Sequence, residues 1–314
     1  MKKYTVIDAH CDTASEILDS GEELYSNNRH LSLEKISNYN SYIQFYAAWV
    51  DKNSKNPFLR AVEILDKIKQ EVRQNSGVIE EIKCLNDVKS VISKRKHGAI
   101  YSIEDARALC GSVASVRAFY DLGVRAITLA WNDDNEVTDG IASIRGAGLT
   151  EFGKEVVREM NRLNMIVDVS HITEKGFWDV LQVSDSPVMA SHSNVKTLCS
   201  HRRNLSDAQI SAMINKNGII CVNIYPDFLS DDGCATIDTV ILHIDHILSL
   251  GGENYIGLGS DFDGVDRLID NFNGANDYAK LFEKMSKIGY SDALIDKITH
   301  KNMINFMERI EKSK

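Results

Sequence analysis

Residues 6–13 read VIDAHCDT, an apolar segment that ends in an H-x-D pair. The run Tyr4–Ala9 is apolar and predicts a strand. Because residues i and i+2 of a strand point to the same face, His10 and Asp12 can reach one metal ion together. Alone, this pair is a weak signal, since an ordinary polar strand end fits it as well. The metal interpretation gains weight because later strands end in the same way.

Seven further apolar, β-rich runs follow, with helical patterns between several of them. These runs are Tyr42–Val50, Ala99–Ile103, Ala126–Trp131, Met165–Ser170, Pro187–Ser191, Gly218–Tyr225 and Tyr255–Gly259. Strands that alternate with helices imply a parallel sheet. Eight strands in roughly 260 residues match a (β/α)8 TIM barrel. A doubly wound sheet is the alternative, but no glycine-rich fingerprint follows the first strand.

Helical patterns separate these runs, and several carry recognisable start and stop signals. The expected helices are Phe58–Arg73, Val113–Leu122 before Gly123, Glu151–Leu163 after Thr150, Ile210–Asn215 behind a capping box of Ser206 and Gln209, Thr236–Leu250, and one from Ser291 to about Lys312. A loop with a short helix is expected over residues 27–40. Three prolines and no low-complexity linker favour a single barrel domain over residues 1–314.

Composition narrows the possible partners and the compartment. The net charge of −9 argues against non-specific nucleic-acid binding. No run of 18 apolar residues exists, so no membrane span is expected, and the N-terminus lacks the apolar region of a signal peptide. The six cysteines include no C-x-x-C motif, which favours reduced thiols in a cytoplasmic protein. The sequence leaves the oligomeric state open, with a homodimer as one option.

The expected strand ends carry the chemistry, because the active site of such a barrel lies at the C-terminal ends of its strands. Five ends supply imidazole or carboxylate groups, which are good ligands for zinc and similar divalent metals. These groups belong to His10 with Asp12, Glu104, His171, His192 and Asp261. The alternative is a set of buried, hydrogen-bonded polar residues without a metal.

The ligand set predicts two metal ions. His10 and Asp12 would hold one ion, and His171 and His192 the other. Glu104 would bridge them, because no lysine lies at these strand ends to serve as a carboxylated bridge. Two ions about 3.5 Å apart can share a hydroxide at neutral pH and polarise a carbonyl.

Other polar residues are interpreted as structural. His243 and His246 are expected on an outer helix face, and Cys11 in the core. Asp8 and Asp168 lie upstream in their strands, where they could accept hydrogen bonds from ligand histidines. Structural roles are also expected for His30, His97, His201, His300, Cys199 and Cys221.

The chain resembles the membrane (renal) dipeptidase family of zinc metallopeptidases, from about Val6 to Phe306. The motifs that carry the resemblance are IDAHCDT (7–13), SIEDA (102–106), GLTEFGKEVVREMNRLNMIVDVSHIT (148–173), SHSNVKTLCSHRRN (191–204) and GLGSDFDGV (257–265). Together they are far more specific than one H-x-D pair.

This resemblance implies a (β/α)8 barrel with two Zn²⁺ ions that hydrolyses free dipeptides through a metal-bridging hydroxide. Some family members also open β-lactam rings. The resemblance implies the same five metal ligands, with Glu104 as the catalytic bridge. It further implies that Arg203 grips the substrate carboxylate, for which a guanidinium fork is well suited. Asp261 would contact the substrate and transfer a proton.

Several points stay open at this stage. Where the family has a histidine that steadies the tetrahedral intermediate, this chain has Trp131, which either packs or shapes the substrate site for small second residues. Asp263 is expected to share a strand face with Asp261, so spacing does not say which is catalytic. The animal relatives are secreted and lipid-anchored, which nothing here supports. The alternative functions are another two-metal hydrolase of amides, lactams or lactones, and a peptide-binding protein without catalysis.

Overall fold

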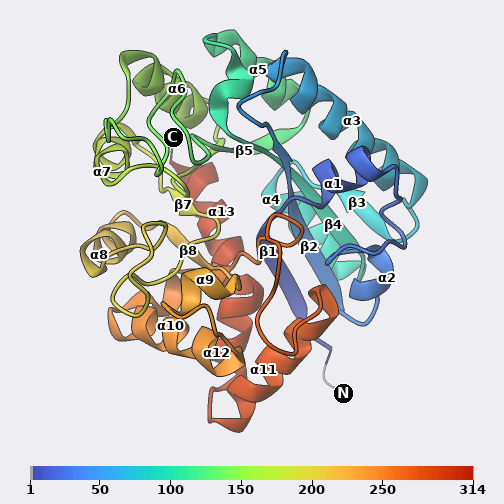
Figure 1. Ribbon diagram of the computed structural model, residues 1–314. Helices are drawn as coiled ribbons and strands as arrows, with labels where there is room; N and C mark the ends of the chain where they lie inside the picture. Colours follow the sequence, from blue (N-terminus) through green and yellow to red (C-terminus); the bar gives the residue numbers. More distant parts are fainter. Residues whose placement is uncertain (1–2, 314) are drawn as a thin grey trace.

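The computed structural model describes residues 3–313, in which nine strands form one parallel sheet. Strand β2 pairs with both β1 and β4, and this closes the sheet into a barrel of eight strands (Figure 1). The barrel strands are β1 Thr5–Cys11, β2 Ser41–Trp49, β4 His97–Glu104, β5 Val124–Thr128, β6 Ile166–Asp168, β7 Met189–Ala190, β8 Ile219–Val222 and β9 Ile256–Leu258. The remaining strand, β3 Ile79–Glu81, pairs with the start of β4. The predicted TIM barrel is confirmed, and each predicted run overlaps one barrel strand.

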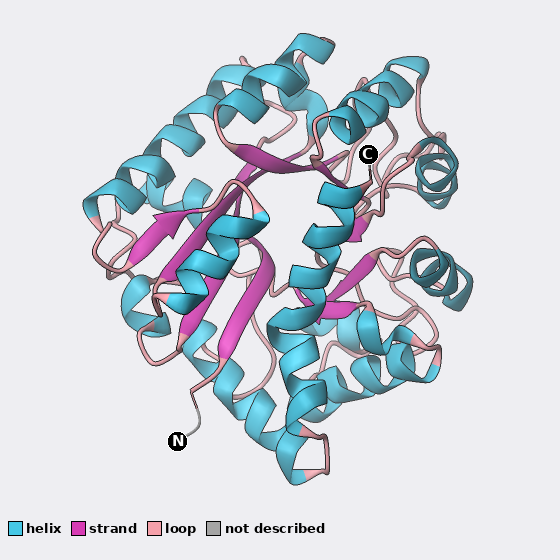
Figure 2. Ribbon diagram, turned by 180° about the vertical axis from the view of Figure 1, so that it is seen from behind, coloured by secondary structure: helices cyan, strands magenta, loops and turns pink. Residues whose placement is uncertain are grey.

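Helices surround the strands on the outside of the barrel (Figure 2). They are α1 Thr13–Ser20, α2 Leu33–Ile36, α3 Pro57–Gln74, α4 Leu85–Ser93, α5 Val113–Asp121, α6 Glu151–Arg162, α7 Glu174–Val183, α8 Asp207–Asn215, α9 Pro226–Leu229, α10 Ile237–Ser249, α11 Tyr278–Lys287, α12 Asp292–Asp296 and α13 Asn302–Lys312. Short 3₁₀ turns cover Ala106–Leu109, Gly252–Asn254 and Ala275–Asp277. Within residues 3–313, no helix combines the length and the apolar character that crossing a membrane requires.

The predicted helix signals act as expected in most places. The Thr150 hydroxyl accepts a hydrogen bond from the Gly153 amide at the start of α6. Ser206 and Gln209 form the predicted capping box of α8. The expected last helix from Ser291 to about Lys312 is confirmed as one continuous helical stretch, in which the segment Lys297–Lys301 between α12 and α13 is π-helical.

Two apolar clusters hold the barrel together. The larger cluster fills the space between the strands and the surrounding helices. The smaller one lies inside the barrel, where Ile7 and Phe45 belong to the same cluster as Met303 and Phe306 of α13. Helix α13 therefore covers the N-terminal end of the barrel, which leaves the C-terminal strand ends for the polar residues.

Candidate metal centre

The closed barrel brings the predicted ligand residues together at its C-terminal strand ends. Glu104 is the last residue of β4, and His10 lies one residue before the end of β1. His171 follows β6 with a positive φ of 69°, a backbone region that is uncommon for residues other than glycine. His192 follows β7, and Asp12 directly precedes α1. These turns aim the side chains at one point above the barrel.

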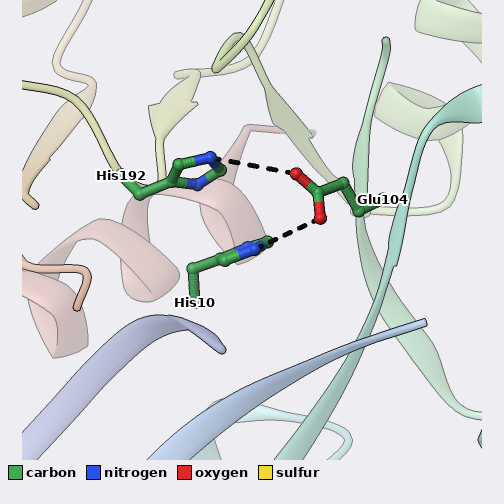
Figure 3. Close-up of side chains that lie close together, drawn as sticks. All are labelled: His10, Glu104 and His192. Atoms are coloured by element: carbon green, nitrogen blue, oxygen red, sulfur yellow. Dashed lines mark ion pairs between the residues drawn. The ribbon is translucent and has the colours of Figure 1, made fainter. Parts of the chain in front are cut away.

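Glu104 lies between two groups of ligand residues, and its two oxygens face different groups. Its Oε2 lies 3.4 Å from Nε2 of His10. Its Oε1 lies 3.1 Å from Nε2 of His171 and 3.9 Å from Nε2 of His192. Figure 3 shows the carboxylate of Glu104 facing the rings of His10 and His192, with one oxygen directed at each. A carboxylate in this position can bridge two cations.

The remaining distances complete the two groups. Nε2 of His10 lies 3.4 Å from Oδ2 of Asp12 and 3.8 Å from Oδ1 of Asp261. The Nε2 atoms of His171 and His192 lie 2.8 Å from each other. Candidate ligand atoms of His10, Glu104 and His192 all lie within 4.8 Å of one another, as do those of His10, Asp12 and Asp261.

Burial and unsatisfied atoms show that this residue set fits a metal. His10, Glu104 and His192 are each at most 2% exposed. Among the described residues, Nε2 of His10 and Oδ1 of Asp12 are buried and have no hydrogen-bond partner. Buried polar atoms without partners are uncommon and costly in folded proteins. Divalent cations coordinated by these atoms would satisfy them.

The electrostatics of these residues point the same way. Burial raises the pKa of Glu104 to about 8, although the neighbouring His10 opposes this shift. Burial also holds the pKa values of His171 and His192 well below the usual range of histidine. A bound cation reverses this balance for a carboxylate and binds neutral imidazole directly.

Hydrogen bonds fix the two histidines on one side of Glu104. Nδ1 of His171 lies 3.1 Å from Oδ1 of Asn132. Nδ1 of His192 lies 2.8 Å from the hydroxyl of Ser191, which in turn donates to Asp168. The sequence did not indicate that Asn132 and Ser191 contact these two rings, because neutral polar residues beside a strand end give no distinctive signal.

The sequence predicts that Asp8 and Asp168 can both accept hydrogen bonds from ligand histidines, and the structure corrects this expectation for the ring of His10. Asp168 reaches a ligand histidine, but through Ser191 and not directly. Asp8 accepts hydrogen bonds from the backbone amides of His10 and Ser260 and from the hydroxyl of Tyr278. Asp8 therefore orders the backbone at the end of β1.

A cavity of about 640 Å³ opens above these residues and is lined by Glu104, Asp261 and Arg203. The Arg203 guanidinium is buried, lies 5.4 Å from the ring centroid of Phe228 and donates to the carbonyl of His192. Burial lowers its pKa to about 10, so it stays charged at neutral pH. Among the described residues, its Nε atom has no hydrogen-bond partner.

Asp261 and Trp131 also line this cavity. Asn223, which sequence analysis did not identify, donates to Oδ2 of Asp261 over 3.0 Å and orients the carboxylate. The ring of Trp131 meets Trp49 edge to face, with centroids 5.3 Å apart. It also lies 6.2 Å from the ring of His171. Trp49 and Trp131 therefore form an aromatic wall of the cavity beside His171.

The expectation for Asp263 is wrong. Asp263 does not share a strand face with Asp261, because both residues have positive φ values, 67° and 64°, which end the strand alternation. Instead, Asp263 accepts hydrogen bonds from the Thr13 hydroxyl and the His30 amide. Both aspartates line the cavity above the barrel, and Oδ1 of Asp261 lies 3.8 Å from Nε2 of His10.

The expectation of an outer face for His243 is also wrong. Its side chain is fully buried, where it contacts the carbonyl of Leu229 and accepts from the amide of Val195. His246 lies at the surface and contacts Asp207. His201 lines the cavity, beyond the structural role expected for it.

Comparisons with known proteins agree with this architecture. A metallopeptidase from Rhodobacter sphaeroides, solved with a phosphinate mimic of the dipeptide L-Ala-D-Ala, superimposes with a TM-score of 0.91 at 24% identity over 98% of this chain and 100% of that chain. A dipeptidase AC of peptidase family M19 superimposes with a TM-score of 0.92 at 25% identity, over 98% of this chain and 99% of that chain.

Sequence relatives and a family model give the assignment. An uncharacterized dipeptidase of Schizosaccharomyces pombe is 39% identical over 69% of this chain but over only 54% of its own length, so the match spans about half of that relative. An uncharacterized protein in the pqqA 5′ region of Klebsiella pneumoniae is 31% identical over 77% of this chain and 93% of its own length. The model of the membrane dipeptidase family matches residues 1–314. The chain therefore belongs to the membrane dipeptidase family, peptidase family M19.

Proposed function

We propose that this protein is a metal-dependent dipeptidase that holds two Zn²⁺ ions, with other divalent metals as alternatives. The observation that carries the proposal is the position of Glu104, whose Oε1 faces His171 and whose Oε2 faces His10. Family membership supports the same activity. His10 and Asp12 would hold one ion, and His171 and His192 the other. A pair of such ions supplies Lewis-acid polarisation and activation of water.

Arg203 would bind the free carboxylate of the dipeptide. Its buried guanidinium lines the cavity beside the metal centre and can form a two-point contact with a carboxylate. A carboxylate held there, one residue beyond the scissile bond, places the peptide carbonyl toward Glu104. This arrangement favours free dipeptides over longer or C-terminally amidated peptides.

Asp261 would move the proton that the leaving amine needs. Its Oδ1 faces His10, and Asn223 fixes its other oxygen. Burial raises the pKa of Asp261, mainly through desolvation, so a carboxylate in this place can take up a proton and release it again. Asp263 is engaged by Thr13 and His30, which makes it the weaker candidate for this role.

The proposal also covers the domain organisation and the cellular compartment. The closed sheet and the full-length family match support one barrel domain over residues 1–314. Within residues 3–313, all six cysteines are free thiols, which supports a reducing compartment such as the cytoplasm.

The test is a substrate panel assayed on purified protein with added zinc. The panel contains free dipeptides, the same dipeptides with amidated C-termini, N-acyl amino acids and lactones. We expect turnover of free dipeptides and little of the other classes. Preferred turnover of lactones or N-acyl amino acids would replace the dipeptidase assignment by another two-metal hydrolase. Peptide binding without turnover of any class would exclude catalysis.

A further inference from the structure

A continuous chain of buried hydrogen bonds leads from strand β6 to the ring of His192. Asp168, at the end of β6, Ser191 and His192 are each at most 1% exposed. The Ser191 hydroxyl lies 2.5 Å from Oδ2 of Asp168 and 2.8 Å from Nδ1 of His192. Solvent does not reach these groups, so their protons must be shared among the groups themselves.

Counting protons fixes the direction of each bond. An ionised carboxylate only accepts hydrogen bonds. Asp168 receives them from the amides of Ser170 and Ser191 and from the hydroxyl of Thr128. The single hydroxyl proton of Ser191 therefore points to Asp168. The Ser170 hydroxyl, 3.3 Å from the Ser191 oxygen, can then only donate to that oxygen. Its oxygen is left with lone pairs toward His192, and only a proton on Nδ1 of that ring can fill this contact.

We propose that Asp168 is a positioning residue that acts through Ser191 to keep the proton of His192 on Nδ1, so that Nε2 presents its lone pair to the metal centre. The proposal rests on the metal centre described under the proposed function. The Nε2 atom lies 3.9 Å from Oε1 of Glu104, on the side where a cation would bind. A proton on Nε2 would block coordination there.

His171 has no equivalent hydrogen-bond chain to a carboxylate behind its Nδ1 atom among the described residues. Its Nδ1 faces the side-chain amide of Asn132, which carries both an acceptor and a donor group. By rotating its amide, Asn132 can serve either tautomer of the ring. The carboxylate of Asp168 has no such freedom, so the two histidines of this group differ in how firmly their protons are placed.

Ser191→Ala is the most direct variant, because it removes the hydroxyl and keeps the backbone bond from the Ser191 amide to Asp168. Ser193→Ala is the matched control. Ser193 is also a buried serine next to His192, and among the described residues its hydroxyl has no hydrogen-bond partner. Ser191→Thr keeps a hydroxyl and should behave like the wild type.

The first readout is the tautomer of His192 in metal-free protein, measured by NMR of ¹⁵N-labelled histidine rings and assigned by the signal lost in His192→Gln. We expect the Nδ1–H form in the wild type, Ser193→Ala and Ser191→Thr, and a shift toward the Nε2–H form in Ser191→Ala. An Nε2–H ring in the wild type, or an unchanged ring in Ser191→Ala, would overturn the proposal. The wild-type spectrum decides the point even if a variant fails to fold.

The second readout is zinc affinity, measured by competition with a chelator. Loss of a partner behind a metal-bound histidine typically weakens binding by about 10–100-fold. We expect a loss of this size in Ser191→Ala and none in Ser193→Ala. Equal affinities in the two variants would overturn the positioning role. Both readouts are independent of peptide turnover, so failure of the dipeptidase assignment would be seen separately in the substrate panel.

Discussion

The two sides of Glu104 are built in different ways. On the His171 side, which comprises His171 and His192, each ring has a hydrogen-bond partner on its Nδ1 atom. On the His10 side, which comprises His10 and Asp12, Asp8 fixes the backbone, while Nε2 of His10 and Oδ1 of Asp12 are buried without a partner among the described residues. The first side is ordered through its rings and the second through its backbone. We infer that the His171 side is better prepared to receive an ion.

The largest expected effect concerns the residue shared by both sides. Glu104→Ala removes the carboxylate that faces His10 and His171. We expect metal content to fall from about two ions per chain to one or fewer, because a two-metal site depends on its bridge. Elemental analysis after zinc reconstitution measures this change. Glu283→Ala, at an exposed position on α11, is the control and should keep the wild-type content. A metal content of one ion or less per chain in the wild type would contradict the two-metal model.

The next effect concerns the substrate carboxylate. Arg203→Ala should lose about 2–5 kcal/mol of transition-state binding on free dipeptides, since the guanidinium is buried. Arg203→Lys keeps the charge without the fork and should lose less. The measurement is kcat/KM on matched free and amidated dipeptides. If the wild type cleaves both equally well, Arg203 does not read the carboxylate.

A third prediction addresses the order in which the two sides fill. We expect His10→Asn to retain one tightly bound zinc ion. We expect His171→Asn, which removes a ligand, to weaken binding of the first ion by more than the roughly 10–100-fold expected when only a supporting contact is lost. Stepwise zinc titration of chelator-treated protein separates these cases. The reverse order, with the first ion weakened only in His10→Asn, would show that backbone order matters more than ring order.

The last prediction concerns Trp131, which packs against Trp49 and lies near His171. If its indole N–H contributes to stabilising the reaction, Trp131→Phe should lose up to about 10²–10³ in kcat, as for loss of one oxyanion donor. Trp131→His should then retain or raise kcat. If Trp131 only packs, Phe should match the wild type. The comparison uses Ala-Ala and a dipeptide with a bulky second residue, and two unchanged variants would exclude a role in specificity.

The barrel could be predicted from the sequence because each buried parallel strand is a short apolar run, and eight such runs are hard to arrange otherwise. Charged and imidazole groups at strand ends could be found for the same reason, since they interrupt apolar runs. Asn132, Ser191 and Asn223 could not be found in this way. They are neutral, and their roles depend on which strand lies beside which.

The errors have physical causes too. Asp263 departs from the face of Asp261 because both backbones turn through positive φ, which strand periodicity does not anticipate. His243 looked like a surface residue because its helix is amphipathic, but helix α9, which ends at Leu229, covers it. The role of α13 in closing the barrel depends on long-range packing against residues such as Ile7.

The most direct test of a two-metal dipeptidase is a zinc titration of chelator-treated protein with hydrolysis of Ala-Ala as the readout. We predict no turnover without metal and a rise that levels off at about two zinc ions per chain, as expected for a site in which both ions act together. Undiminished hydrolysis in the presence of chelator, or no hydrolysis at any zinc concentration, would contradict the assignment.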